Sequence, residues 1–170
     1  MLDQYIEKHG KRLYGLCVTL CGSRFDADDL YQETWLRVCQ KIDEYDDRYA
    51  FEPWLTRICV NIYRDRLRKS RLEPLFDIFS TSEEKDGVME SVSAQDDGTR
   101  ENGELRELVD KLPDKLRTAV ILHYFNDMDI AKTAAVLGVP PGTVKSRLSK
   151  ARSILKQFLT EEDGNEDAGI

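Results

Sequence analysis

The amino-acid sequence predicts an all-α protein, made of two small helical domains joined by a flexible acidic linker. Apolar residues recur at intervals of three and four through most of the chain, which is the spacing of one helix face. No stretch shows the alternation of apolar and polar residues that is typical of a strand. The segment 72–104 breaks the helical pattern, because acids, serines and glycines replace most apolar residues.

The first predicted domain, residues 1–71, is expected to contain three helices. Apolar residues recur at helical spacing between residues 2 and 21, and Gly22 can end this helix because glycine adopts the left-handed conformation at low cost. Asp26 is expected to cap a second helix that runs to about residue 42. The acidic and aromatic segment 43–52 has no clear period and is predicted to be a loop.

Pro53 suits the first turn of the third helix, which is expected to end near residue 70. The linker, residues 72–104, follows this helix and is rich in acids but carries only two bases, Lys85 and Arg100. Such a segment buries too little apolar surface to fold by itself, so we expect it to be flexible.

The second predicted domain, residues 105–159, is expected to contain helices that begin near residues 105, 113, 129 and 141. Pro113 and Pro141 suit the first position of a helix, and Gly138 suits the end of the third. The tail, residues 160–170, is acidic and is expected to be disordered.

The residues that often carry catalysis or bind metals form no recognisable site. The four cysteines, Cys17, Cys21, Cys39 and Cys59, lack a paired C-x-x-C spacing, so they are interpreted as small core residues, with a thiol-sensing role left open. There is no Ser-His-Asp pattern, phosphate-binding glycine loop or metal-ligand cluster. We therefore expect no enzyme activity, cofactor, metal or small-molecule substrate.

No apolar run approaches the roughly 20 residues that a membrane-spanning helix needs, so direct membrane insertion is not expected. The N-terminal stretch MLDQYIEKHGKRLYG is charged and lacks the apolar region of a signal peptide. The expected location is the cytoplasm.

The last predicted helix is basic, although the net charge of the chain is −7. On a helical wheel one side is apolar, with Val144, Leu148, Ala151, Leu155 and Phe158. The opposite side carries small hydroxyl residues and cations, and two arginines flank the apolar side. Between residues 130 and 160 there is no acid, although the chain holds 32, and carboxylates there would repel phosphate. This face predicts a helix that lies in the DNA major groove.

The preceding helix and turn are typical of a helix-turn-helix. Ala134 is small where two helices would cross, Gly138 would form the turn, and Val144 would anchor the second helix. Gly142 and Thr143 would then place backbone N–H groups and a hydroxyl at a helix N-terminus, which favours phosphate binding.

A second basic cluster, RICVNIYRDRLRKSR at residues 57–71, holds six cations (Arg57, Arg64, Arg66, Arg68, Lys69 and Arg71) and one acid, Asp65. Asn61 can pair with a base edge, and nearby aromatic residues can stack on exposed bases. The two basic clusters indicate two nucleic-acid contacts on one chain.

These motifs resemble those of RNA polymerase sigma factors of the extracytoplasmic-function type. DADDLYQETWLRV at 26–38 is similar to the family's region 2.2, and FEPWLTRICVNIYRDRLRK at 51–69 to regions 2.3 and 2.4. LPDKLRTAVILHYF at 112–125 is similar to region 4.1, and AAVLGVPPGTVKSRLSKAR at 134–152 to region 4.2. The resemblance covers most of the chain outside the linker and the tail.

The resemblance implies three sets of contacts. The promoter −35 element would meet Gly142, Thr143, Lys145, Ser146, Arg147, Ser149, Lys150 and Arg152. The −10 element would be recognised, melted and captured by Tyr45, Tyr49, Phe51, Arg57, Asn61 and Arg64. The clamp helices of the polymerase β′ subunit would meet Asp29, Gln32, Glu33 and Arg37. The β flap of the polymerase and an anti-sigma factor are further implied partners.

Other classes of protein remain open at this point. An autonomous helix-turn-helix regulator would account for residues 105–159, but not for the DDLYQETW helix or the second basic cluster. A protein that only sequesters partners is another alternative, and an enzyme is a third. The sequence thus favours a promoter-specificity subunit without excluding a free DNA-binding regulator.

Overall fold

The computed structural model describes residues 1–77 and 100–166, and within these ranges the regular structure is helical and includes no strand. The chain divides into two compact units, Met1–Ala94 and Gln95–Ile170, here called the N-terminal unit and the C-terminal unit. The predicted all-α class is confirmed. No helix in the described ranges is long and apolar enough to cross a membrane.

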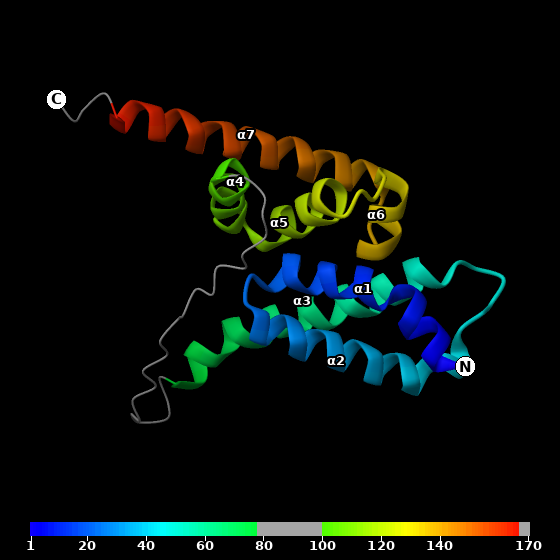
Figure 1. Ribbon diagram of the computed structural model, residues 1–170. Helices are drawn as coiled ribbons and strands as arrows, with labels where there is room; N and C mark the ends of the chain where they lie inside the picture. The colour runs from blue at the N-terminus through cyan, green and yellow to red at the C-terminus, as the bar shows by residue number, and fades with distance from the viewer. Residues whose placement is uncertain (78–99, 167–170) are drawn as a thin grey trace. The chain divides into compact units, whose positions relative to one another are not determined.

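The N-terminal unit is a bundle of three helices, α1 (Leu2–Cys21), α2 (Arg24–Lys41) and α3 (Phe51–Asp77), which lie side by side in Figure 1. A short 3₁₀ helix, η1 (Ile42–Glu44), follows α2 and leads into a loop before α3. Apolar side chains from all three helices form the core: Leu13, Leu16, Leu20, Ala27, Leu30, Val38, Leu55, Val60 and Ile62.

The turn between α1 and α2 shows why the second helix begins earlier than predicted. Gly22 has φ +68 and its N–H donates to the carbonyl of Val18, so the predicted end of α1 is confirmed. The cap of α2 is Ser23, whose Oγ accepts a hydrogen bond of 3.3 Å from the backbone N–H of Asp26. The prediction that Asp26 is the cap is therefore wrong, because Ser23 has the extended backbone that a cap needs.

The C-terminal unit contains α4 (Arg100–Asp110), α5 (Asp114–Val120), a π-helical turn η2 (Ile121–Phe125), α6 (Ile130–Leu137) and α7 (Pro141–Glu166). Helices α5 and α6 pack against α7, and the core is lined by Leu108, Val109, Leu112, Ala119, Ile121, Leu122, Val136, Leu137, Val144 and Leu148. The helix-turn-helix predicted from the sequence is formed by α6 and the first half of α7.

Two expectations about flexible segments of the chain need correction. Helix α3 continues to Asp77 and α4 begins at Arg100, so both ends of the predicted linker, 72–104, are helical, while residues 78–99 lie outside the described ranges. Helix α7 continues to Glu166, so the predicted disordered tail is helical over most of its length. Glutamate favours helices, and each of these segments belongs to a longer helix, which outweighs the acidic composition on which the expectations rested.

The four cysteines are free thiols, but they do not all lie in the core. Cys17 and Cys59 are buried, Cys21 is half-buried and Cys39 is exposed. The expectation of four core cysteines is therefore wrong for Cys39, which lies on the outer side of α2.

Gly138, which ends α6, is expected to tolerate substitution by alanine less well than Gly103 of α4. Its φ is +67, a conformation that side chains with a Cβ rarely adopt, so Gly138→Ala should destabilise the unit by about 1 kcal/mol. Gly103→Ala is the matched control, because Gly103 lies within α4 and an added Cβ would meet nothing within 4 Å. Chemical denaturation should place Gly138→Ala below the wild type and Gly103→Ala at or above it; equal midpoints would contradict the argument.

Candidate functional site

The first half of α7 separates a buried side from a basic, exposed side. Val144, Leu148 and Ala151 are at most 2% exposed, as the wheel predicted. The other side is exposed and contains Gly142, Lys145, Ser146, Ser149 and Lys150, here called the outer face of α7. Because the apolar stripe is fixed in the core, these cations and small hydroxyl side chains are held together toward solvent.

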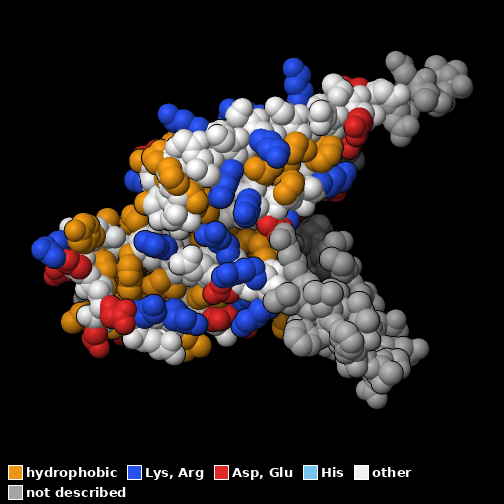
Figure 2. Space-filling model, turned by 180° about the vertical axis from the view of Figure 1, so that it is seen from behind, with side chains coloured by type: hydrophobic (Ala, Val, Ile, Leu, Met, Phe, Trp, Pro, Cys, Tyr) orange, Lys and Arg blue, Asp and Glu red, His pale blue; other side chains and the backbone are white. Residues whose placement is uncertain are grey.

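The acids of α7 gather at its C-terminal end, whereas Lys and Arg side chains lie along the rest of the helix (Figure 2). Thr143 and Arg147 are half-buried beside the apolar stripe. Arg152 is exposed, and its Nη1 donates a hydrogen bond of 2.9 Å to the hydroxyl of Tyr124. The structure therefore gathers the eight predicted −35 residues on one stretch of helix.

In the N-terminal unit, an aromatic cluster joins the start of α3 to α1. Phe51 stacks on Tyr5 with ring centroids 4.1 Å apart, and Tyr45 and Trp54 contact it at 5.3 and 5.5 Å. His9 completes the cluster at 5.2 Å from Phe51, and burial together with nearby Lys8 lowers its pKa. Phe51 is only 6% exposed, so the prediction that it stacks on a base is corrected: its ring faces are already covered by protein.

The loop before α3 is held by the same cluster. The hydroxyl of Tyr45 donates to the carbonyl oxygen of Tyr49, whose own ring is 70% exposed. At the turn, Arg48 pairs with Asp46 through its Nε at 2.9 Å, and this pairing lowers the pKa of Asp46. The loop thus has a fixed base and presents one free aromatic ring, that of Tyr49, to solvent.

Three further predicted −10 residues follow one another along α3. Arg57 and Asn61 are exposed and Arg64 is half-buried, and their spacing of four and three residues places them on one helix face. This row of polar side chains lies on the helix that directly follows the Tyr49 loop.

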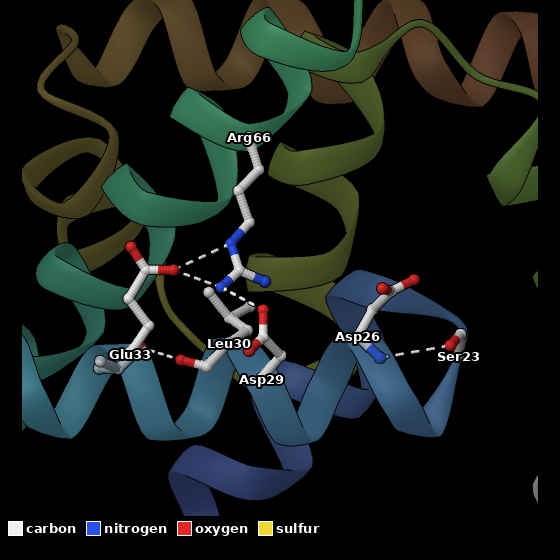
Figure 3. Close-up of polar contacts among 7 residues, drawn as sticks. Ser23, Asp26, Asp29, Leu30, Glu33 and Arg66 are labelled. Atoms are coloured by element: carbon white, nitrogen blue, oxygen red, sulfur yellow. Dashed lines mark hydrogen bonds and ion pairs between the residues drawn. The ribbon is translucent and has the colours of Figure 1, made fainter.

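Two of the four residues predicted to meet polymerase are joined to α3 (Figure 3). Arg66 of α3 contacts the carboxylate of Asp29 at 2.9 Å, and its Nε donates to Glu33 at 3.2 Å. Partial burial would by itself lower the pKa of Arg66, but the two carboxylates outweigh it and raise that pKa. The ion triad links α2 to α3 at the edge of their packed core.

The outward side of α2 carries two apolar residues that the sequence analysis missed. Phe25 is 82% exposed and Leu36 is 63% exposed. Together with Asp29 and Gln32 they follow helical spacings of four, three and four, so these four residues form one row, here called the α2 row. A helical wheel of residues 24–41 would have found them. Arg37 is exposed beside this row.

Family models match both units. Residues 5–73 match the Sigma-70 region 2 model and residues 102–155 match the Sigma-70 region 4 model. These ranges contain the α2 row, the aromatic cluster and the outer face of α7. Within the described ranges no three His, Cys, Asp or Glu side chains are arranged to hold a metal ion.

The chain is similar to several curated sigma factors. It is 32% identical to the ECF RNA polymerase sigma factor SigE of Mycolicibacterium smegmatis over 94% of this chain and 62% of that protein. It is 36% identical to EcfG of Rhodopseudomonas palustris over 92% of this chain and 83% of that protein. It is 29% identical to SigW of Bacillus subtilis over 92% of this chain and 87% of that protein.

A solved structure has the same fold. It is the sigma factor RpoE of Bartonella quintana in complex with the anti-sigma factor NepR, with a TM-score of 0.72, 25% identity, and coverage of 93% of this chain and 96% of that one. Both helical units and both family regions therefore agree with the sequence motifs. The chain belongs to the ECF family of RNA polymerase sigma factors.

Proposed function

We propose that this sigma factor binds core RNA polymerase through α2 and reads promoter DNA with α3 and α7. The observation that carries the proposal is the outer face of α7: it is exposed and basic in an acidic chain, and it lies within the region 4 match. The chain supplies binding and positioning in this proposal, and the polymerase supplies the chemistry of RNA synthesis.

In the proposed complex the outer face of α7 enters the major groove at the −35 element. Lys145 and Lys150 reach phosphates or guanine edges, while Ser146 and Ser149 are short enough for the backbone to approach the bases. Arg147 and Arg152 lie at the sides of this face and contact phosphates. The backbone N–H groups at Gly142 and Thr143, together with the hydroxyl of Thr143, meet another phosphate at the N-terminus of α7.

At the −10 element the proposed roles are divided between the loop and α3. Arg57, Asn61 and Arg64 meet the backbone and base edges of the DNA strand that is opened. Tyr49 stacks on a base that has left the duplex, since a flipped base must recover part of its lost stacking energy. Tyr45 and Phe51 hold the loop in place.

For polymerase binding we propose that the α2 row meets the β′ clamp helices. Phe25 and Leu36 supply apolar contact area, Gln32 and Arg37 supply hydrogen bonds, and the triad of Asp29, Glu33 and Arg66 keeps the helix in position.

The β flap of the polymerase is proposed to meet the C-terminal unit. An anti-sigma factor is a further proposed partner, since the similar RpoE structure contains one. We further propose that the chain described here acts in the cytoplasm.

Reconstitution tests the proposal. The purified chain is mixed with bacterial core polymerase and genomic DNA fragments, and run-off transcripts are sequenced. New start sites that share two upstream motifs would support it. Absence of polymerase binding and of new starts, with DNA shifted by the chain alone, would instead indicate an autonomous regulator.

A further inference from the structure

Two buried thiols face each other in the core of the N-terminal unit. The Sγ atoms of Cys17 on α1 and Cys59 on α3 are 3.7 Å apart, although the residues are 42 positions apart in the chain. Both side chains are 0% exposed, and both are reduced. The sulfur atoms are already in contact, so a bond between them would join α1 directly to α3.

The two thiols share a hydrogen bond that either sulfur atom can donate. The hydrogen bond between the two thiols, together with burial, raises the pKa of Cys17, and the same hydrogen bond lowers the pKa of Cys59. Burial opposes ionisation of both thiols, and because either sulfur atom can donate the hydrogen bond, either one can become the thiolate. A thiolate beside a protonated thiol is the arrangement from which a disulfide forms in two steps.

Cys17 lies close to the C-terminal end of α1. Cys17 is one turn before Cys21, the last residue of the helix, and Cys21 is only half-buried. Helix ends open more readily than helix centres, so we expect local opening of this last turn to admit hydrogen peroxide. Cys39, in contrast, is exposed on α2 and no hydrogen bond to it is found in the described structure.

We propose that hydrogen peroxide joins Cys17 and Cys59 in an intramolecular disulfide that links α1 to α3. One of the two sulfur atoms, as its thiolate, attacks one peroxide oxygen, the O–O bond breaks, and the departing hydroxide takes up a proton to become water. The other thiol then attacks the sulfenic sulfur, the S–S bond forms, and the S–O bond breaks to release a second water. Two thiols lose two electrons in total, and one peroxide gains them.

The disulfide requires the sulfur atoms to approach by about 1.7 Å, to a bond length of about 2.05 Å. Side-chain rotation and a small shift of α1 supply this movement. Closing a loop of this length restricts the unfolded chain, so the oxidised N-terminal unit should unfold at a temperature about 10 °C higher or more. The inference does not depend on promoter recognition, because the experiment measures the covalent state of the thiols and the melting temperature of the protein.

The test treats the full-length chain with hydrogen peroxide, then counts thiols with a maleimide after denaturation and maps cross-linked peptides by mass spectrometry. The expected result is a fall from four thiols to two, a Cys17–Cys59 peptide pair lighter by two hydrogens, and a rise in melting temperature that dithiothreitol reverses. Cys39→Ser, the matched control, should give the same peptide pair, and Cys17→Ala should give none.

Three results would overturn the proposal. One is a full count of four thiols after treatment, another is a cross-link confined to Cys39 between two chains, and the third is a Cys17–Cys21 pair. If Cys17→Ala fails to fold, the wild-type peptide map alone still decides between these outcomes, because it identifies both partners of any disulfide.

Discussion

Lys145→Glu combined with Lys150→Glu is expected to lower the affinity of the polymerase-bound chain for a −35 duplex by about 100-fold or more. Both side chains are exposed on the outer face of α7, one turn or more apart, while Val144 and Leu148 beneath them are buried. Each reversal removes a cation and places a carboxylate against phosphate. Because neither side chain packs in the core, the fold and the binding of core polymerase should be unchanged.

Lys111→Glu combined with Lys115→Glu provides the matched control. These two lysines are exposed in the same unit, and their reversal changes the net charge by the same amount. Fluorescence anisotropy of a labelled −35 duplex measures DNA binding, and co-elution with core polymerase measures the other function. Equal losses in the two double variants would mean that net charge, and not the outer face of α7, controls DNA binding. If Lys145→Glu combined with Lys150→Glu also abolished polymerase binding, the proposal that this face of α7 serves only DNA binding would be contradicted.

The parts of this structure that the sequence predicts are those decided within a few turns of helix. The spacing of apolar residues in α7 predicted which side of the helix is buried. Gly22 and Gly138 predicted helix ends, because only glycine adopts the backbone conformation found there readily. The outer face of α7 followed from the same stripe, since the opposite side of an amphipathic helix must face solvent.

The parts that the sequence did not predict depend on contacts between distant segments. Phe51 is covered by Tyr5 and His9 of α1, more than 40 residues earlier in the chain, so its burial could not be seen from the loop alone. The contact between Cys17 and Cys59 is of the same kind. The pairing of Asp29 and Glu33 with Arg66 likewise needed the packing of α2 against α3, whereas the exposed Leu36 was within reach of a helical wheel.

Phe25→Ala combined with Leu36→Ala is expected to weaken binding of core polymerase by at least about 30-fold, the effect of losing one hot-spot residue. Both side chains are largely exposed, at 82% and 63%, so their removal costs the free chain little stability. In the proposed complex they are the largest apolar groups of the α2 row. Large side chains that become fully buried against a partner contribute most of the binding free energy of an interface. Titration of labelled core polymerase measures the affinity, and thermal unfolding of the free chain checks the fold.

Tyr49→Ala separates this result from a general effect of removing exposed apolar area. Tyr49 is 70% exposed in the same unit, but it lies on the loop before α3 and not on α2. This variant should keep its affinity for core polymerase and lose binding to single-stranded −10 DNA, because base stacking on an aromatic ring contributes about 1–3 kcal/mol. If Tyr49→Ala weakens polymerase binding as much as the double variant does, the α2 row is not the polymerase contact. If neither protein loses affinity, the contact lies elsewhere on the N-terminal unit or on the C-terminal unit, and the triad around Arg66 serves only to hold the helices together.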